Sequence, residues 1–174
     1  GGLVCGNKEI VDRIFHFREI NGACLDPNPA YLILRGMKTL ALRMNKHNEN
    51  ALELANWLSD HDKIENVFYP GLNNHKGSEI AKKQMTGYGG VLSFSVKDEK
   101  MIPIFISNLS FAHAAAHLGS LDTIVGPPKT TSHVENTSKE RAELGIPNNL
   151  IRCSVGIEHI DDIKNDFNQA LLKL

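Results

Sequence analysis

The chain has 174 residues, of which 41% are hydrophobic and 22% are charged, which is the balance of a soluble globular protein. Its net charge of -1 gives no electrostatic basis for binding nucleic acid or a membrane surface, so neither partner is expected. No apolar run approaches the roughly 20 residues that span a bilayer, and no signal peptide is visible. Cys5, Cys24 and Cys153 occur in unrelated contexts and predict reduced, mostly buried thiols in a cytoplasmic protein.

The first third of the chain predicts a short strand followed by two helices. Residues 2–6 are apolar and closed by glycine, which is typical of a short buried strand. Asn7 can cap a helix, and we expect that helix to run to about Ile20. A turn at residues 26–29 begins a second, long helix, whose apolar residues recur at steps of three and four as far as Leu58. Such a helix could join two domains.

The rest of the chain alternates short strands with short helices, so the expected fold is α/β, with a sheet covered by helices. In chain order the expected elements are a strand at 67–69, a helix at 78–85, a strand at 91–96, a helix at 102–109, a strand at 123–125, a short helix capped by Thr137 and Glu140, a strand at 150–157 and a final helix at 160–174.

Arg152 lies within the last predicted strand, which is otherwise apolar or small up to Glu158. A guanidinium stays charged at any ordinary pH, and a buried one requires an anionic partner. Its planar fork suits a carboxylate held by two hydrogen bonds, so one interpretation is a carboxylate-binding residue directed into a cleft. The alternatives are an arginine on the solvent face of the strand, or one paired with an internal Asp or Glu.

His113 and His117 are four residues apart, a spacing that on a helix would place both imidazoles on one face. Such a pair could hold zinc with a third ligand, for which His133 is the nearest candidate. No Glu follows the first histidine, so the metalloprotease signature is absent. We expect no metal site, and we interpret the two residues as unrelated histidines in a loop.

Five segments carry motifs in a fixed order along the chain: residues 31–40, 69–72, 87–94, 141–146 and 150–158. Together they resemble the C-terminal portion of the pyridoxal-phosphate (PLP) enzymes of cysteine and methionine metabolism. That family includes cystathionine γ-synthases, cystathionine lyases, methionine γ-lyases and O-acylhomoserine sulfhydrylases. Its Schiff-base lysine lies in a Ser-x-Thr-Lys segment, which does not occur in this sequence. The resemblance therefore places that lysine upstream of Gly1.

The resemblance implies the fold and domain organisation of a fold type I PLP enzyme. Residues 1–55 would be the end of the large PLP-binding domain together with a long interdomain helix. Residues 56–174 would be a small C-terminal domain, with a mostly antiparallel sheet of about four strands and helices on one face. The complete enzyme would be a homo-oligomer, expected to be a tetramer.

The resemblance also implies roles for individual residues. Arg152 would hold the α-carboxylate of a sulfur amino-acid substrate, with His117 and Leu118 in a loop beside it. Family members often carry Ser or Asn at the position of His117, so this residue departs from the common pattern. Thr130 and Ser132 would line the entrance of the active site, although a surface turn rich in hydroxyls is an equal alternative.

The chemistry implied for the complete enzyme is β- or γ-elimination, or γ-replacement, on a sulfur amino acid. PLP would be bound mainly by the N-terminal half of the same enzyme, and no catalytic residue is expected in this chain. The isolated chain should therefore be inactive. The alternative function is a non-catalytic domain, or one half of a split protein, that only docks on a separate PLP-binding half.

Overall fold

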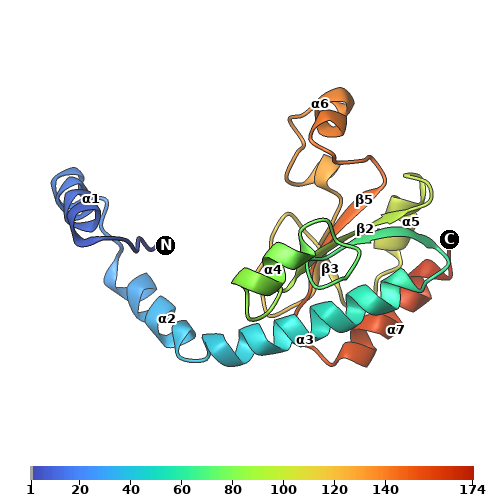
Figure 1. Cartoon of the computed structure of the whole chain (residues 1–174), viewed down its shortest axis with the longest axis horizontal. Helices are drawn as coiled ribbons and strands as arrows, with labels where there is room; N and C mark the ends of the chain where they lie inside the picture. The colour runs from blue at the N-terminus through green and yellow to red at the C-terminus, as the bar shows by residue number, and fades with distance from the viewer. Residues whose placement is uncertain (1) are drawn as a thin grey trace. The chain divides into compact units, whose positions relative to one another are not determined.

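The computed structural model describes residues 2–174, and their contacts group the chain into two units, Gly1–Leu42 and Arg43–Leu174. Gly1, with which the expected segment 1–55 begins, lies outside the described residues. Figure 1 shows the elements in chain order: α1 Lys8–Asn21, α2 Pro27–Met37, α3 Leu40–Ser59, β1 Ile64–Phe68, α4 Ser78–Gln84, β2 Val91–Val96, α5 Met101–Ser107, β3 His113–Ala114, β4 Ile124–Gly126, the 3₁₀ helix η1 Pro128–Thr130, α6 Ser138–Glu143, β5 Leu150–Ser154 and α7 Ile160–Leu171. None of the helices in this described part is long and apolar enough to cross a lipid bilayer.

Both expected helix starts in the first unit are confirmed by their caps. The Asn7 side chain accepts a hydrogen bond from the Ile10 N–H at 3.0 Å and begins α1. The Asp26 side chain accepts from the Asn28 N–H at 2.9 Å and begins α2, with Pro27 at the first helical position. These caps satisfy backbone donors that a helix leaves unpaired at its N-terminus.

The strand expected at residues 2–6 is wrong. These residues form no strand, and the side chain of Leu3 is 74% exposed. A strand needs a neighbour to pair with its backbone, and the described residues of this unit contain no other strand.

The single long helix expected from residue 27 to Leu58 is also wrong, because α2 and α3 are separated at Lys38 and Thr39. The Lys38 N–H turns to the carbonyls of Arg35 and Gly36, which tightens the end of α2. Gly36 has a low helix propensity, and this local cost favours a break in the helix soon after it, at Lys38 and Thr39.

The expectation of mostly buried cysteines is wrong as well. All three thiols are free, but Cys5 and Cys24 are exposed and only Cys153 is buried. Cys5 and Cys24 belong to the first unit, where no residue of α1 or α2 is buried.

The second unit is built on a five-stranded sheet with the order β1-β2-β5-β4-β3. The pairs β1–β2, β2–β5 and β4–β5 are antiparallel, whereas β3 and β4 are parallel. The mostly antiparallel sheet is therefore confirmed, with five strands in place of about four. The additional strand β3 has two residues, too few to produce an alternating pattern in the sequence.

Helices cover one face of this sheet, as expected. In Figure 1, α3 and α7 lie on the same side of β2 and β5. Alternate residues of the two strands point into the core, which α3, α5 and α7 complete. The buried residues that these five elements contribute to it are Leu92, Phe94, Val96, Ile151, Cys153, Ala51, Leu54, Ala55, Leu58, Ile102, Phe105, Ile160, Ile163, Phe167, Ala170 and Leu171.

Three phenylalanines join the sheet to two of the covering helices. Phe94 of β2, Phe105 of α5 and Phe167 of α7 are fully buried. The ring centroids lie 5.8 Å apart for Phe94 and Phe105, 6.2 Å for Phe94 and Phe167, and 5.4 Å for Phe105 and Phe167. The Phe94–Phe105 and Phe105–Phe167 pairs are edge-on, and such pairs stabilise a core beyond the area they bury. This cluster fixes β2, and through it β5, against the helices.

Candidate carboxylate-binding site

Arg152 lies on the face of the sheet opposite the helices. It is paired in register with Ser93 of β2 and with Gly126 of β4. Its neighbours Ile151 and Cys153 are buried in the core, so the alternation of a strand directs the Arg152 side chain to the other face. The residue is partly buried there.

The guanidinium of Arg152 meets a backbone carbonyl. Its Nη2 donates a hydrogen bond to the carbonyl oxygen of His117 at 3.0 Å. Within residues 2–174 it forms no ion pair with Asp or Glu, so the interpretation of an internal carboxylate partner is wrong. A guanidinium has five N–H donors, so donors of Arg152 other than the one bonded to His117 can bind an anion from outside the described residues.

The loop that supplies the His117 carbonyl, residues 115–121, is held against the same face of the sheet. The Gly119 N–H donates to Ser154 Oγ at 3.0 Å. Gly126 allows the loop to approach β4, because a Cβ atom at this position would lie 2.9 Å from the Ala115 carbonyl oxygen. Sequence reasoning missed Ser154, although its place two residues after Arg152 on one strand is the signal that could have found it.

The other expected site residues do not all lie beside the contact between Arg152 and the His117 carbonyl. His117 contributes its carbonyl, while its side chain is exposed, and Leu118 beside it is 51% exposed. Thr130 donates to the Pro127 carbonyl at 3.3 Å, and Ser132 Oγ lies 2.9 Å from His133 Nδ1. In the described part of the chain neither hydroxyl bonds to Arg152. The structure thus brings the 117–118 segment to Arg152 and places Thr130 and Ser132 in a neighbouring loop.

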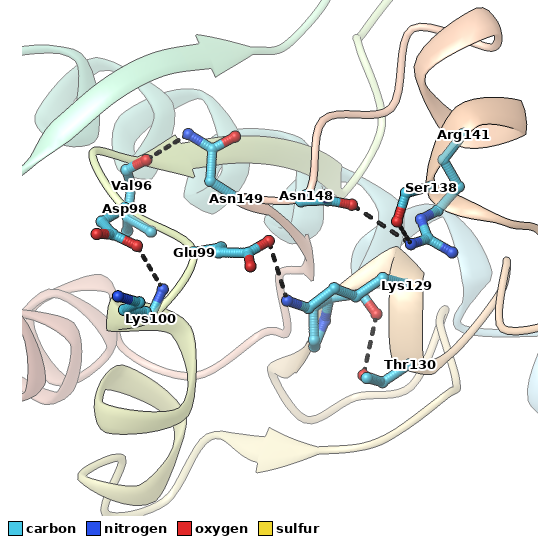
Figure 2. A network of polar contacts seen from close by, with 11 residues as sticks. Val96, Asp98, Glu99, Lys100, Lys129, Thr130, Ser138, Arg141, Asn148 and Asn149 are labelled. Atoms are coloured by element: carbon cyan, nitrogen blue, oxygen red, sulfur yellow. Dashed lines mark hydrogen bonds and ion pairs between the residues drawn. The ribbon is translucent and has the colours of Figure 1, made fainter.

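Figure 2 shows polar contacts of this neighbouring loop and of the segments around it. Lys129 Nζ lies 3.6 Å from Glu99 Oε2 and ties η1 to the turn before α5. Arg141 of α6 is buried, and its Nη2 donates to Ser138 Oγ at 3.1 Å and to Asn148 Oδ1 at 3.3 Å. A partly exposed ion pair contributes only about 0–1 kcal/mol, so the Lys129–Glu99 pair restrains η1 weakly. The Arg141 contacts instead hold α6 to the turn before β5.

The two histidines with helical spacing are not on a helix. His113 belongs to strand β3, and His117 lies in the loop that follows it. In the range that the structure describes, no three His, Cys, Asp or Glu side chains are grouped so that they could hold a metal ion.

Cys153, next to Arg152 in the strand, points to the opposite face. Burial raises the pKa of its thiol well above the usual range, and the negative charge of Glu158 raises it further. The thiol therefore stays protonated near neutral pH and does not serve as a nucleophile. The charged group of β5 is therefore Arg152, on the other face of the strand, where its guanidinium contacts the backbone of residues 115–121.

Comparison with known proteins places this sequence in one family. Residues 1–172 match the family described as Cys/Met metabolism PLP-dependent enzyme. The chain is 42% identical to a cystathionine beta-lyase of Lactococcus lactis subsp. cremoris (strain MG1363), over 99% of this chain and 46% of that protein. It is 42% identical to an L-methionine gamma-lyase of Fusobacterium nucleatum subsp. polymorphum, over 99% of this chain and 45% of that protein. It is 41% identical to the chloroplastic cystathionine gamma-synthase 1 of Arabidopsis thaliana, over 98% of this chain and 30% of that protein.

The chain thus spans about half the length of the two lyases, and it matches their C-terminal part. The three relatives carry different reaction names at nearly the same identity. Identity alone therefore supports the family and does not select one reaction within it.

Proposed function

The chain belongs to the Cys/Met metabolism PLP-dependent enzyme family, and on this premise we propose that it is the C-terminal half of an enzyme acting on a sulfur amino acid. The proposed reaction is β- or γ-elimination, or γ-replacement. Membership implies the fold type I class, with which the α/β fold of the described residues agrees. The proposed domains of the complete enzyme are residues 1–55, at the end of the large domain, and residues 56–174.

The observation that carries this proposal is the state of Arg152. It is a partly buried guanidinium on an apolar strand, and the described residues offer it a carbonyl but no carboxylate. Such a charge is stabilised best by an anion that can accept two hydrogen bonds in one plane. The α-carboxylate of an amino acid has this geometry, so Arg152 would bind and orient the substrate. His117, Leu118, Thr130 and Ser132 would surround it.

The proposed partner of this chain is the N-terminal half of the same enzyme. On α1, Ile10, Ile14 and Phe17 follow one another at helical spacing, and all three are exposed. On α2, Tyr31 and Leu34 are exposed in the same way. Contiguous exposed apolar residues of this kind indicate a surface that another protein segment covers. We further propose that the complete enzyme is a homotetramer.

The residues of this chain do not by themselves fit the cofactor. A lysine that forms a Schiff base is activated by desolvation or by a neighbouring cation, yet every lysine in residues 2–174 is at least partly exposed to solvent. Lys129, the lysine of the loop beside β5, is paired instead with the carboxylate of Glu99. The PLP-binding lysine and phosphate donors are therefore assigned to the N-terminal half.

The proposal predicts opposite results for the isolated chain and for the complete enzyme. Borohydride reduction with PLP, followed by peptide mapping, should label no single lysine of the 174-residue chain, and the chain should not turn over cystathionine or methionine. The complete enzyme should be yellow and should turn over at least one of these substrates. The cause is that the lysine and the phosphate donors lie outside this chain.

Two outcomes would contradict the proposal. One lysine of the isolated chain labelled stoichiometrically, together with turnover, would place the catalytic lysine within this sequence. A complete protein that binds no PLP and turns over no sulfur amino acid would favour the alternative of a non-catalytic docking domain.

A second prediction concerns the side chain of His117 in the complete enzyme. If this imidazole faces the substrate, His117→Asn keeps a hydrogen-bond donor but moves it, so turnover of the amino acid should fall modestly. His113→Asn is the matched control, because His113 is also exposed but lies in β3, and its turnover should stay unchanged. Unchanged turnover for His117→Asn would place its side chain outside the site.

A further inference from the structure

Glu158 follows β5 and binds the residue before β4 with both carboxylate oxygens. Its Oε1 accepts a hydrogen bond from the Thr123 N–H at 2.5 Å, and its Oε2 accepts from Thr123 Oγ1 at 2.9 Å. Thr123 is fully buried, and its Oγ1 also accepts from the Gly156 N–H at 3.0 Å. Hydrogen bonds to an ionised carboxylate are among the stronger ones in a protein. Glu158 therefore makes a two-point anchor for the chain at Thr123.

The backbone segments on either side of this anchor lie so close together that no side chain fits between them at Gly156. The Ile157 N–H donates to the Leu121 carbonyl at 2.9 Å. A Cβ atom on Gly156 would lie 2.1 Å from Glu158 Oε2 and 2.3 Å from the Leu121 carbonyl oxygen, so glycine alone fits there. The segment before β4 is thus pressed against the segment after β5.

Helix α3 holds the segment after β5 from another direction. Asn50 Nδ2 donates to the Gly156 carbonyl at 3.0 Å and to the Glu158 carbonyl at 2.8 Å. His47 Nδ1 lies 2.7 Å from the Val155 carbonyl oxygen. Both side chains are buried. The backbone of Glu158 is therefore held in place by α3. Its carboxylate, bonded to Thr123, holds Thr123 in place in turn.

The loop that meets Arg152 ends at this anchor. Residues 115–121 are attached at their start by the Ala115 N–H, which donates to the Val125 carbonyl at 3.2 Å. They are attached at their end by the contacts of Leu121 and Thr123 described above. Between these two points lie the His117 carbonyl and the Gly119 N–H, which bind Arg152 and Ser154.

We propose that Glu158 is a positioning residue for the carboxylate site. By anchoring Thr123 it sets the path of residues 115–121, and the His117 carbonyl then orients the guanidinium of Arg152. The proposal deepens the proposed function and rests on it for its effect on substrate, while its effect on the loop can be measured separately. Glu158 itself touches neither the substrate nor the cofactor in this scheme.

The test compares Glu158→Ala, Glu158→Gln and Asp162→Ala in the complete enzyme. Asp162 is the matched control, since it lies four residues further on, is exposed, and its side chain makes no hydrogen bond or ion pair in residues 2–174. Glu158→Ala should speed amide hydrogen exchange in residues 115–121 about tenfold and raise KM for the amino acid about tenfold, with kcat within about twofold. Glu158→Gln keeps an acceptor for the Thr123 N–H and should restore both values to within about twofold of wild type. Asp162→Ala should change neither.

Unchanged exchange in residues 115–121 of Glu158→Ala would overturn the proposal, as would faster exchange with an unchanged KM. An equal rise in KM for an amine analogue that lacks the carboxylate would also overturn it, because the effect would then not pass through Arg152. If Glu158→Ala does not fold, Thr123→Val removes only the hydroxyl and should show the same changes at smaller size. If the wild-type enzyme turns over no sulfur amino acid, the proposed function fails, and hydrogen exchange still decides the role of Glu158 in the loop.

Discussion

Arg152→Ala in the complete enzyme should weaken binding of the amino-acid substrate by about 2–5 kcal/mol, the usual cost of truncating one member of a buried charge pair. This corresponds to a rise in Kd of roughly 30-fold to several thousand-fold. The reason is that the substrate carboxylate loses its bidentate partner, and the carbonyl of His117 cannot replace it, because a carbonyl oxygen repels an anion. The amount of bound PLP, measured by its absorbance, should stay unchanged, because the lysine and phosphate donors that bind the cofactor are assigned to the N-terminal half.

Arg152→Lys is the informative companion to this variant. Lysine keeps the positive charge but loses the planar fork, so its affinity should fall between those of wild type and Arg152→Ala. An amine analogue of the substrate without the carboxylate should bind all three proteins equally. Near-normal affinity and turnover for Arg152→Ala would show that the carboxylate assignment is wrong.

Phe167→Ala should lower the free energy of unfolding of the second unit by about 3–5 kcal/mol. Phe167 is fully buried and packs against Phe94 and Phe105, so its removal leaves a cavity between α7, α5 and the sheet. That loss approaches the whole free energy of unfolding of a marginally stable domain, about 5 kcal/mol, so the urea midpoint should fall markedly. Urea unfolding of the 174-residue chain can be followed by the fluorescence of Trp57, its single tryptophan, which packs against the same core.

Leu172→Ala is the matched control for the core prediction. Leu172 lies at the end of the same helix but is 70% exposed, so its truncation should change stability by no more than about 0.5 kcal/mol. Equal losses for the two variants would contradict the assignment of Phe167 to the centre of the core.

Signals that act over short distances were readable from the sequence. Asn7 and the pair Thr137 and Glu140 predicted the starts of α1 and α6, because a cap bonds within one helical turn. The apolar pattern predicted β2 at residues 91–96 and the strand that carries Arg152. The ordered motifs predicted the family, which the match over residues 1–172 confirms.

Features that depend on distant partners were not readable in this way. Residues 2–6 have the composition of a strand but no strand beside them, and β3 exists only because His113 and Ala114 pair with β4. The break between α2 and α3 also escaped prediction, because the apolar spacing continues across Lys38 and Thr39 while the backbone does not.

At the candidate site, the residue pattern was enough to place Arg152 on an apolar strand and to show that its burial would require an anion. The groups around Arg152 could not be read from that pattern: they are the His117 carbonyl, 35 residues earlier, and no carboxylate among the described residues. Glu158 and Thr123, also 35 residues apart, likewise meet only in the folded chain. The period of a strand assigns a side chain to a face, whereas the groups that contact it there depend on which distant segment packs against that face.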